Sequence, residues 1–232
     1  MHPRIVTPEW MDRDNVPLDE LQRSLAFIRR VNRYLCGTRA VISHLRKFSL
    51  RWPPGRPITI LDVATGSGDI PLAIARWARR ARHDVRVTAL DRHALTLELA
   101  ARHVRGEPQV TLVRADALEP PFAPGTFDYV VSSLFLHHLS DERVVDALEM
   151  MRRLARRGVI WNDLLRHRRA GWWCRLLTAA STPIVKHDAV ASIRAGFLRH
   201  EVESLRDRLR LGHLRFHRHV GHRFTLAGEV AD

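Results

Sequence analysis

From residue 57 onward, short apolar segments alternate with longer amphipathic segments. The short segments have the length of buried strands, and the longer ones have the spacing of helices that bury one side. Strands that alternate with helices form parallel βαβ units, in which helices cover both faces of a central sheet. We therefore predict strands at 58–64, 85–91, 110–115, 127–133 and 158–163, with helices at 70–81, 94–104 and 144–156.

The region before this alternation has a different pattern. Leucines and isoleucines between Leu18 and Leu35 recur at roughly helical spacing, and a cluster of prolines and one glycine then interrupts the chain. The sequence predicts two parts, an N-terminal helical cap over residues 1–56 and a main domain over residues 57–232.

The last third of the chain returns to helical patterns. Ser140 is a plausible N-cap for the helix that precedes residue 157, because its hydroxyl can accept a hydrogen bond from a free backbone N–H group. We expect further helices at about 165–180, 187–195 and 199–210. Two short segments around Gly221 predict a closing antiparallel hairpin.

The charge of the chain is concentrated in one segment. The 232 residues include 38 Lys and Arg against 25 Asp and Glu, which gives a formal net charge of +13. Residues 152–223 hold 17 of the cations and five of the acids, so this segment alone carries +12. Such an excess suggests an acidic ligand, an anionic surface or nucleic acid as a partner, and a solvated basic face is the other interpretation.

Cysteine content and hydropathy restrict the compartment. Cys36 and Cys174 are too few for a disulfide framework, and no CxxC pair predicts a metal site. The N-terminus lacks the apolar core of a signal peptide, and no stretch approaches the roughly 18 apolar residues of a membrane helix. We therefore expect a soluble cytoplasmic protein with no metal and no transmembrane segment.

The strongest local signal is a glycine-containing turn at the end of the first predicted strand. It reads Asp62-Val63-Ala64-Thr65-Gly66-Ser67-Gly68-Asp69. A strand that enters such a turn and then a helix lets a ligand approach the backbone where a side chain would obstruct it. This turn is therefore the first candidate for a nucleotide-type cofactor site.

Two more acids follow the next two predicted strands. Asp91 ends the second strand, where a carboxylate can accept hydrogen bonds from both hydroxyls of an adenosine ribose. Asp116 follows the third strand, and its carboxylate can meet the amino group of adenine. Because open α/β sheets bind ligands at the carboxyl ends of their strands, the three acids predict one cofactor site.

A nicotinamide cofactor fits this turn less well. Pro71 stands where the GxGxxG fingerprint has its third glycine, and Asp62 precedes the glycines by only four positions. The cradle for a diphosphate is therefore incomplete, and a smaller amino acid moiety fits better. These features favour S-adenosylmethionine.

Three segments carry a family resemblance: LDVATGSGDIPLAIA, ALD and RADALEPPFAPGTFDYVVSSLFLHHLSD. Together with the helix that follows them, they resemble motifs I to IV of class I S-adenosylmethionine-dependent methyltransferases, over about residues 57–165. They are similar to the branch that contains the quinone C-methyltransferases. The resemblance implies a Rossmann-like α/β fold, with a mostly parallel seven-stranded sheet, helices on both faces and an antiparallel C-terminal strand. Ala64 departs from the common motif, which has a glycine there.

The resemblance also implies site residues. Those expected at the cofactor are Asp62, Ala64, Gly66 and Gly68 near its methionine part, Asp91 at the ribose, Arg92, Asp116 and Ala117 near the adenine, and Ser132 beside the acceptor. Arg92 is equally consistent with a solvated cation.

The acceptor side offers fewer candidates. His137 and His138 are candidate general bases, needed only if the acceptor carries a proton, and an ordinary helix start is the other interpretation. Ser133, Asn162 and Asp163 are candidates for binding the acceptor, although Asn162 and Asp163 also suit a strand-end cap.

The expected reaction follows from the same segments. The fourth predicted strand ends in SSLF, where many base N-methyltransferases carry an Asn/Asp-Pro-Pro-aromatic sequence. We therefore predict methyl transfer to oxygen or activated carbon of a small aromatic, quinone or polyketide-like acceptor. The alternative is an RNA-binding protein or RNA methyltransferase that uses the basic segment 152–223.

Overall fold

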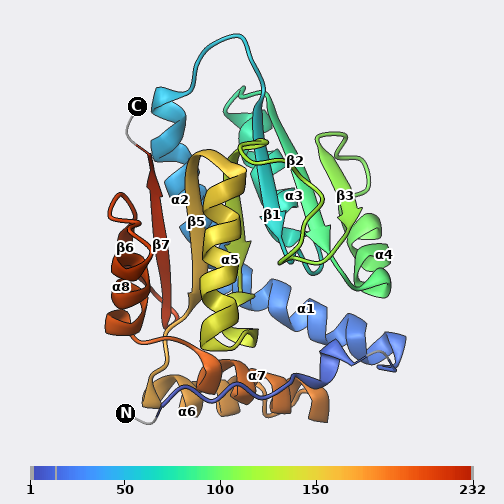
Figure 1. The fold of residues 1–232 in the computed structure, drawn as a ribbon. Coiled ribbons are helices and arrows are strands. Elements are labelled where there is room, and N and C mark those ends of the chain that lie inside the picture. The colour runs from blue at the N-terminus through green and yellow to red at the C-terminus, as the bar shows by residue number, and fades with distance from the viewer. Residues whose placement is uncertain (1–2, 14, 231–232) are drawn as a thin grey trace.

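The computed structural model describes residues 3–13 and 15–230 (Figure 1). The helices are α1 (Leu18–Tyr34), α2 (Gly37–Phe48), α3 (Asp69–Arg80), α4 (Ala94–His103), α5 (Asp141–Leu154), α6 (Arg168–Leu177), α7 (Pro183–Ala195) and α8 (Arg199–Arg208). Short 3-10 turns are η1 (Trp10–Asp12), η2 (Ser49–Arg51) and η3 (Leu136–His138). The strands are β1 (Ile58–Val63), β2 (Val85–Asp91), β3 (Val110–Arg114), β4 (Phe127–Ser133), β5 (Ala155–Leu164), β6 (Arg215–His219) and β7 (Arg223–Glu229).

All seven strands form one sheet in the order β3-β2-β1-β4-β5-β7-β6. The first five strands in the chain run parallel to one another, whereas β7 runs antiparallel to both β5 and β6. The mostly parallel sheet and the antiparallel C-terminal strand confirm the predicted fold. The order reverses beside β1, which places the turn after β1 at a topological switch point, where such sheets bind ligands.

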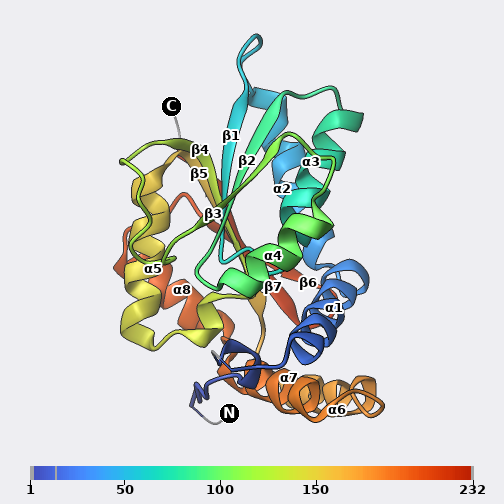
Figure 2. The same cartoon turned by 90° about the vertical axis from the view of Figure 1, so that its right-hand side faces the viewer.

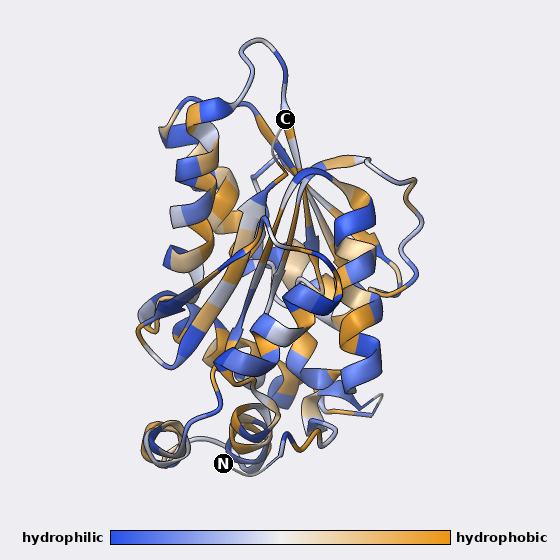
Figure 3. Cartoon of the chain, turned by 60° about the vertical axis from the view of Figure 1, so that its left-hand side comes forward, coloured by the Kyte–Doolittle hydropathy of each residue, from blue (hydrophilic) through white to orange (hydrophobic). Residues whose placement is uncertain are grey.

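Two hydrophobic cores lie on opposite faces of the sheet (Figures 2 and 3). Ile58 and Ile60 of β1 pack against α2 and α3 on one face, while Leu61 and Val63 join the core beneath α5 and α8 on the other. This alternation follows from the strand's period of two residues. Since α2 covers the sheet directly, the N-terminal region contributes to the main core, and the predicted boundary at residue 56 stays a prediction.

The N-terminal segment crosses the carboxyl edge of the parallel strands. Residues 3–13, which we call the N-terminal strap, run beside α7 (Figure 1). The Trp10 amide donates to the Asp188 carboxylate of α7 at 2.7 Å, and the Arg4 guanidinium donates to the Leu139 carbonyl at 2.6 Å. The strap, α1, α6 and α7 therefore gather where the strands end.

The helices and strands after residue 140 are of the types predicted from the sequence, but some of them begin or end at other residues. Ser140 caps α5 as predicted, because its hydroxyl accepts from the Arg143 amide at 3.4 Å. The fifth strand starts earlier than the predicted 158–163, because Ala155 already pairs with Phe127 through an irregular register. The hairpin around Gly221 is present as β6 and β7.

The turn after β1 permits a stability test. Ala64 has φ +56°, a left-handed conformation that costs an L-residue about 1–2 kcal/mol. Ala64→Gly should therefore raise the free energy of unfolding by up to about 1 kcal/mol, after the entropy that glycine adds to the unfolded chain is subtracted. Gly68→Ala should lower it, since Gly68 has φ +72° and a Cβ there would lie 3.0 Å from Val104 Cγ1. Urea unfolding followed by circular dichroism measures both, and the reverse order of stabilities would contradict the strain at Ala64.

Candidate active site

One cavity opens at the turn after β1, and we call it the glycine-turn cavity. Its volume is about 460 Å³. Six of the nine residues predicted at the cofactor line it: Ala64, Gly66, Asp91, Arg92, Asp116 and Ala117. The N-terminal strap closes one side through residues that include Pro8 and Met11. The carboxyl ends of β1, β2 and β3 thus converge on one site, as the sequence predicts.

Asp91 fixes the shape of this cavity as well as lining it. One carboxylate oxygen accepts from the Gly66 amide at 2.9 Å, and the other accepts from the His93 amide at 3.0 Å. Burial raises the pKa of Asp91, while these two hydrogen bonds oppose the rise. A carboxylate has about four lone-pair sites, so two remain for the hydroxyl groups of a ligand.

The other three predicted cofactor residues lie behind the cavity wall. Asp62 is buried, accepts from the Thr65 hydroxyl at 2.6 Å, and has its pKa raised by burial to about 8. Gly68 faces Val104, and Ser132 is buried in β4. In this arrangement they support the turn, and their predicted contacts with a cofactor stay predictions.

A second cavity, which we call the apolar chamber, lies between α1, α6, α7 and the β6–β7 turn. Its volume is about 480 Å³, and its walls are mainly aliphatic and aromatic side chains, among them Phe27, Ile28, Trp173, Leu177 and Ile193. Chambers of this size and character hold small, largely apolar molecules.

The two cavities meet at the N-terminal strap and η3. Glu9, Met11 and Leu134 line both cavities, while His137 lines the apolar chamber and His138 lines the glycine-turn cavity. The predicted pair of histidines therefore stands at the junction between the two cavities.

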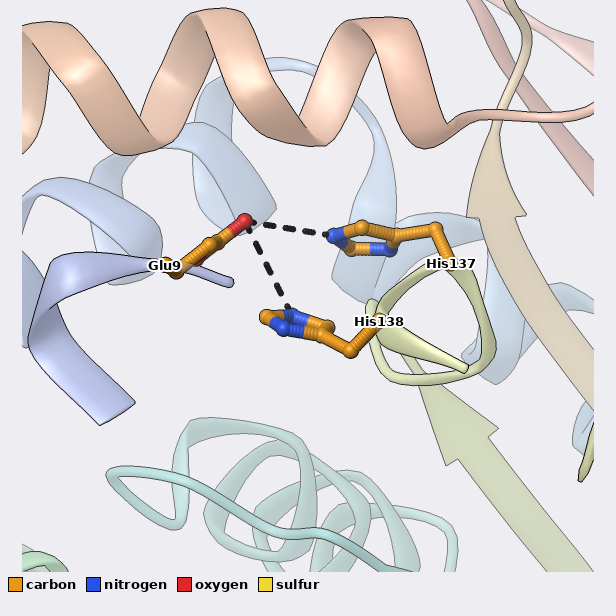
Figure 4. A group of neighbouring side chains, drawn as sticks. All are labelled: Glu9, His137 and His138. Carbon is orange, nitrogen blue, oxygen red and sulfur yellow. Dashed lines mark ion pairs between the residues drawn. The ribbon is translucent and has the colours of Figure 1, made fainter. Parts of the chain in front are cut away.

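Glu9 connects the histidines (Figure 4). Its Oε1 lies 3.7 Å from His137 Nε2 and 3.9 Å from His138 Nε2. On the far side of each ring, His137 Nδ1 lies 2.7 Å from Asp163 and His138 Nδ1 lies 3.1 Å from Asp12. His137 Nε2 is buried and makes no hydrogen bond among the described residues, and the Glu9 carboxylate beside it lies beyond ordinary hydrogen-bond distance. Because His137 lines the apolar chamber, this nitrogen is a candidate for proton exchange with a molecule bound there.

The carboxylates set the charge of this cluster. Burial raises the pKa of Glu9, but the charges of His138 and His137 and the hydrogen bond that Glu9 accepts from the Ser192 hydroxyl outweigh it and lower the pKa to about 2. Burial lowers the pKa of His138, yet Glu9 and Asp12 raise it to about 10. The pKa of His137 is also raised, since the charge of Asp163 outweighs burial. His138 is therefore a cation at neutral pH, and the pKa of His137 lies above its usual range.

The same three side chains are the ones that could share a metal ion, since their donor atoms lie within 4.8 Å of one another. Two ligands bound at about 2.1 Å in a tetrahedral site are only about 3.4 Å apart. The rings of His137 and His138 are tilted, with centroids 4.3 Å apart and an interplanar angle of 35°. Because the pKa of each histidine is raised, protons on these rings are a sufficient positive charge beside Glu9.

The three residues predicted to bind the acceptor lie behind the junction. Asp163 is fully buried and accepts from the His137 ring, the Trp161 indole at 3.1 Å and the Leu164 amide at 2.8 Å. Asn162 donates to the Ser133 hydroxyl at 2.7 Å. None of the three is among the described residues that line either cavity. Their predicted contact with an acceptor stays a prediction, and their position suits support of His137 and of the strand ends.

Glu9 is a candidate site residue that the sequence did not predict. It lies in a segment with no helical or strand periodicity, 128 positions before His137, and only the folded strap brings the two together. The available signal was an acid flanked by apolar residues in Pro8-Glu9-Trp10, which is too common to single out.

Comparison with known proteins indicates the kind of domain that forms this site. Residues 60–158, which include the turn, Asp91, Asp116 and both histidines, match the model of a family described as a methyltransferase domain. This match confirms the predicted resemblance to methyltransferases over that segment, and with it S-adenosylmethionine as the cofactor of the matched domain.

Curated relatives place the domain near quinone-modifying enzymes. A demethylmenaquinone methyltransferase of Porphyromonas gingivalis is 32% identical over 108 residues, which is 45% of this chain and 42% of that protein. A 2-phytyl-1,4-naphtoquinone methyltransferase of Thermosynechococcus vestitus is 35% identical over 96 residues, 41% of this chain and 40% of that protein. The chain thus matches about two fifths of the length of these relatives.

Solved structures extend the likeness of the fold to nearly the whole chain. The magnesium protoporphyrin IX methyltransferase of Synechocystis with bound S-adenosylhomocysteine matches 95% of this chain and 91% of its own, with TM-score 0.60 and 14% identity. None of the three proteins named above is described as an RNA-binding protein or an RNA methyltransferase, so they do not support that alternative. Among residues 3–13 and 15–230, no helix has the length and apolarity needed to cross a membrane.

Proposed function

We propose that this protein transfers the methyl group of S-adenosylmethionine to a hydroxyl oxygen or an activated carbon of a small, largely apolar acceptor of aromatic, quinone or polyketide type. The observation that carries the proposal is the junction of the two cavities, with Asp91 in one, apolar walls in the other and His137 between them. The names of the quinone methyltransferases above support the acceptor class.

The glycine-turn cavity suits the cofactor. Gly66 has φ +54° and no side chain, and its amide is held by Asp91, so backbone and carboxylate present donors and acceptors at the end of β1. When bound, S-adenosylmethionine supplies an electrophilic methyl group and keeps the electron pair of the broken carbon–sulfur bond.

The chain's own residues would manage the proton of the acceptor. Neutral His137 takes a hydroxyl proton on Nε2, while Asp163 holds Nδ1–H and stabilises the imidazolium that forms. Removal of this proton would leave the acceptor oxygen, or a ring carbon activated by it, as the nucleophile for the methyl group that the cofactor supplies. General-base catalysis of this kind contributes about 100- to 10,000-fold. The chamber walls exclude water, and the N-terminal strap keeps Glu9 at the junction.

We also propose that the protein acts in the cytoplasm, in line with its two free cysteines. Its proposed partner is a small molecule, since the described residues that line the apolar chamber include no Arg or Lys to pair with phosphates.

Binding of S-adenosylhomocysteine is the first test. Wild-type protein should gain thermal stability with this ligand, and Asp91→Asn should weaken the affinity at least about tenfold, because charged hydrogen bonds contribute about 1.5–3 kcal/mol each. Asn keeps one acceptor oxygen, so it disturbs the Gly66 amide less than Ala does. Isothermal titration measures the affinity.

Glu98→Gln is the matched control, since Glu98 is an exposed acid of α4 that lines neither cavity. It should leave the affinity unchanged. A folded wild-type protein without any thermal shift would contradict the cofactor, whereas unchanged affinity in Asp91→Asn would contradict only the role of Asp91.

A further inference from the structure

The outer side of α6 exposes large apolar side chains. Trp172 is 61% exposed, Trp173 50%, Leu176 56% and Leu177 57%, and Val220 in the adjoining β6–β7 turn is 73% exposed. We call these five residues the α6 face. Single exposed apolar residues are ordinary, but two tryptophans and two leucines on one ten-residue helix form a contiguous patch that marks an interaction site.

The charges of the segment that carries this face are of one sign. Residues 165–187 contain four arginines and one lysine, and no Asp or Glu. Arg166 is buried and paired with Glu201, whereas Arg169, Arg175 and Lys186 are exposed. Exposed tryptophan and leucine beside Arg and Lys are the composition of a helix that lies in a membrane interface, with its cations toward anionic headgroups.

The face is continuous with the apolar chamber. Trp173, Leu177 and Val220 belong to the face and also line the chamber, so the exposed side chains form the rim of the cavity. On the other side of α6, Ala170 and Cys174 are buried against the chamber. A molecule that leaves a bilayer beneath the α6 face therefore meets apolar side chains all the way to His137.

We propose that the α6 face docks on an anionic lipid bilayer and admits the acceptor to the chamber from the membrane. The apolar rim inserts among acyl chains, and the flanking cations pair with lipid phosphates. Delivery of the acceptor from the membrane depends on the proposed function, in which the acceptor is apolar. Binding of the α6 face to the bilayer does not depend on it. Anionic lipid would then be the partner of those cations of segment 152–223 that are exposed near α6.

Vesicle flotation with the full chain tests the docking, with neither cofactor nor acceptor present. Binding to vesicles of phosphatidylcholine with about 30 mol % phosphatidylglycerol should exceed binding to pure phosphatidylcholine at least about tenfold, and about 0.5 M salt should weaken it. The double variant Trp172→Ser, Leu176→Ser should lower the affinity at least about tenfold, because these side chains insert without lining the chamber.

Leu50→Ser is the matched control, since Leu50 is 85% exposed on η2 and lies outside the α6 face. It should bind vesicles like wild type. Equal binding by the double variant and wild type would overturn the proposal. So would a dimer in sedimentation velocity that the double variant abolishes, since the face would then join two copies of the chain. Affinity for S-adenosylhomocysteine, measured on the same variants, reports separately on the proposed function.

Discussion

Replacing His137 with glutamine should lower turnover by about 100- to 10,000-fold, the contribution of a general base to a step that requires proton removal. His137 has the only Nε2 among the described catalytic candidates that faces the chamber without a hydrogen-bond partner. Affinity for S-adenosylhomocysteine should stay within about twofold, since His137 does not line the glycine-turn cavity. Formation of S-adenosylhomocysteine with naphthoquinols and alkylphenols measures turnover.

His138→Gln is the matched control, because His138 is the neighbouring ring and carries a proton at neutral pH, with a pKa of about 10. A ring that already holds its proton is no base, so this variant should lose less than about tenfold in turnover. Treatment with EDTA should leave the wild-type rate unchanged. Equal losses in both variants, or a loss on chelation that zinc restores, would assign the cluster to a metal ion instead.

The fold was readable from the sequence because local patterns determine most of it. The apolar runs and the turns between them identify every parallel strand, and the glycines near Gly66 mark the turn at the switch point. The bounds were less certain where tertiary pairing overrides propensity, as where Ala155 and the two residues after it join β5 instead of extending α5. The position of α2 against the sheet likewise depends on packing that no local pattern encodes.

The residues that line the glycine-turn cavity were predictable for a related reason. Asp91 ends one parallel strand and Asp116 follows the next, so their order in the chain fixes their place at one edge of the sheet. Their contacts with a cofactor stay predictions. The acceptor side was not predictable, because the apolar chamber combines side chains of α1, α6, α7 and a distant turn. Glu9 reaches the junction through strap contacts such as Trp10 to Asp188, which span most of the chain.

Asp163→Asn should remove the negative charge beside His137 while keeping a side chain of the same size that can hydrogen-bond to the ring. In the wild type the carboxylate accepts Nδ1–H, which leaves the lone pair of His137 on Nε2, facing the chamber. An amide can instead donate to Nδ1 and move the proton to Nε2, where it blocks base catalysis. The equivalent exchange in serine proteases, a known example, costs about 10,000-fold. We expect at least about a tenfold loss of turnover here, with affinity for S-adenosylhomocysteine retained.

The pH profile gives the second readout, which a merely structural role of Asp163 would not move. A base acts when neutral, so wild-type turnover should rise with pH through the pKa of His137, which the charge of Asp163 holds above 6.5 despite burial. Without that charge, burial and the cationic His138 lower the pKa, so the rise should move to lower pH in Asp163→Asn while the plateau falls. A reduced plateau with an unshifted rise would mean that the titrating base is another group, and His137 would lose its assignment.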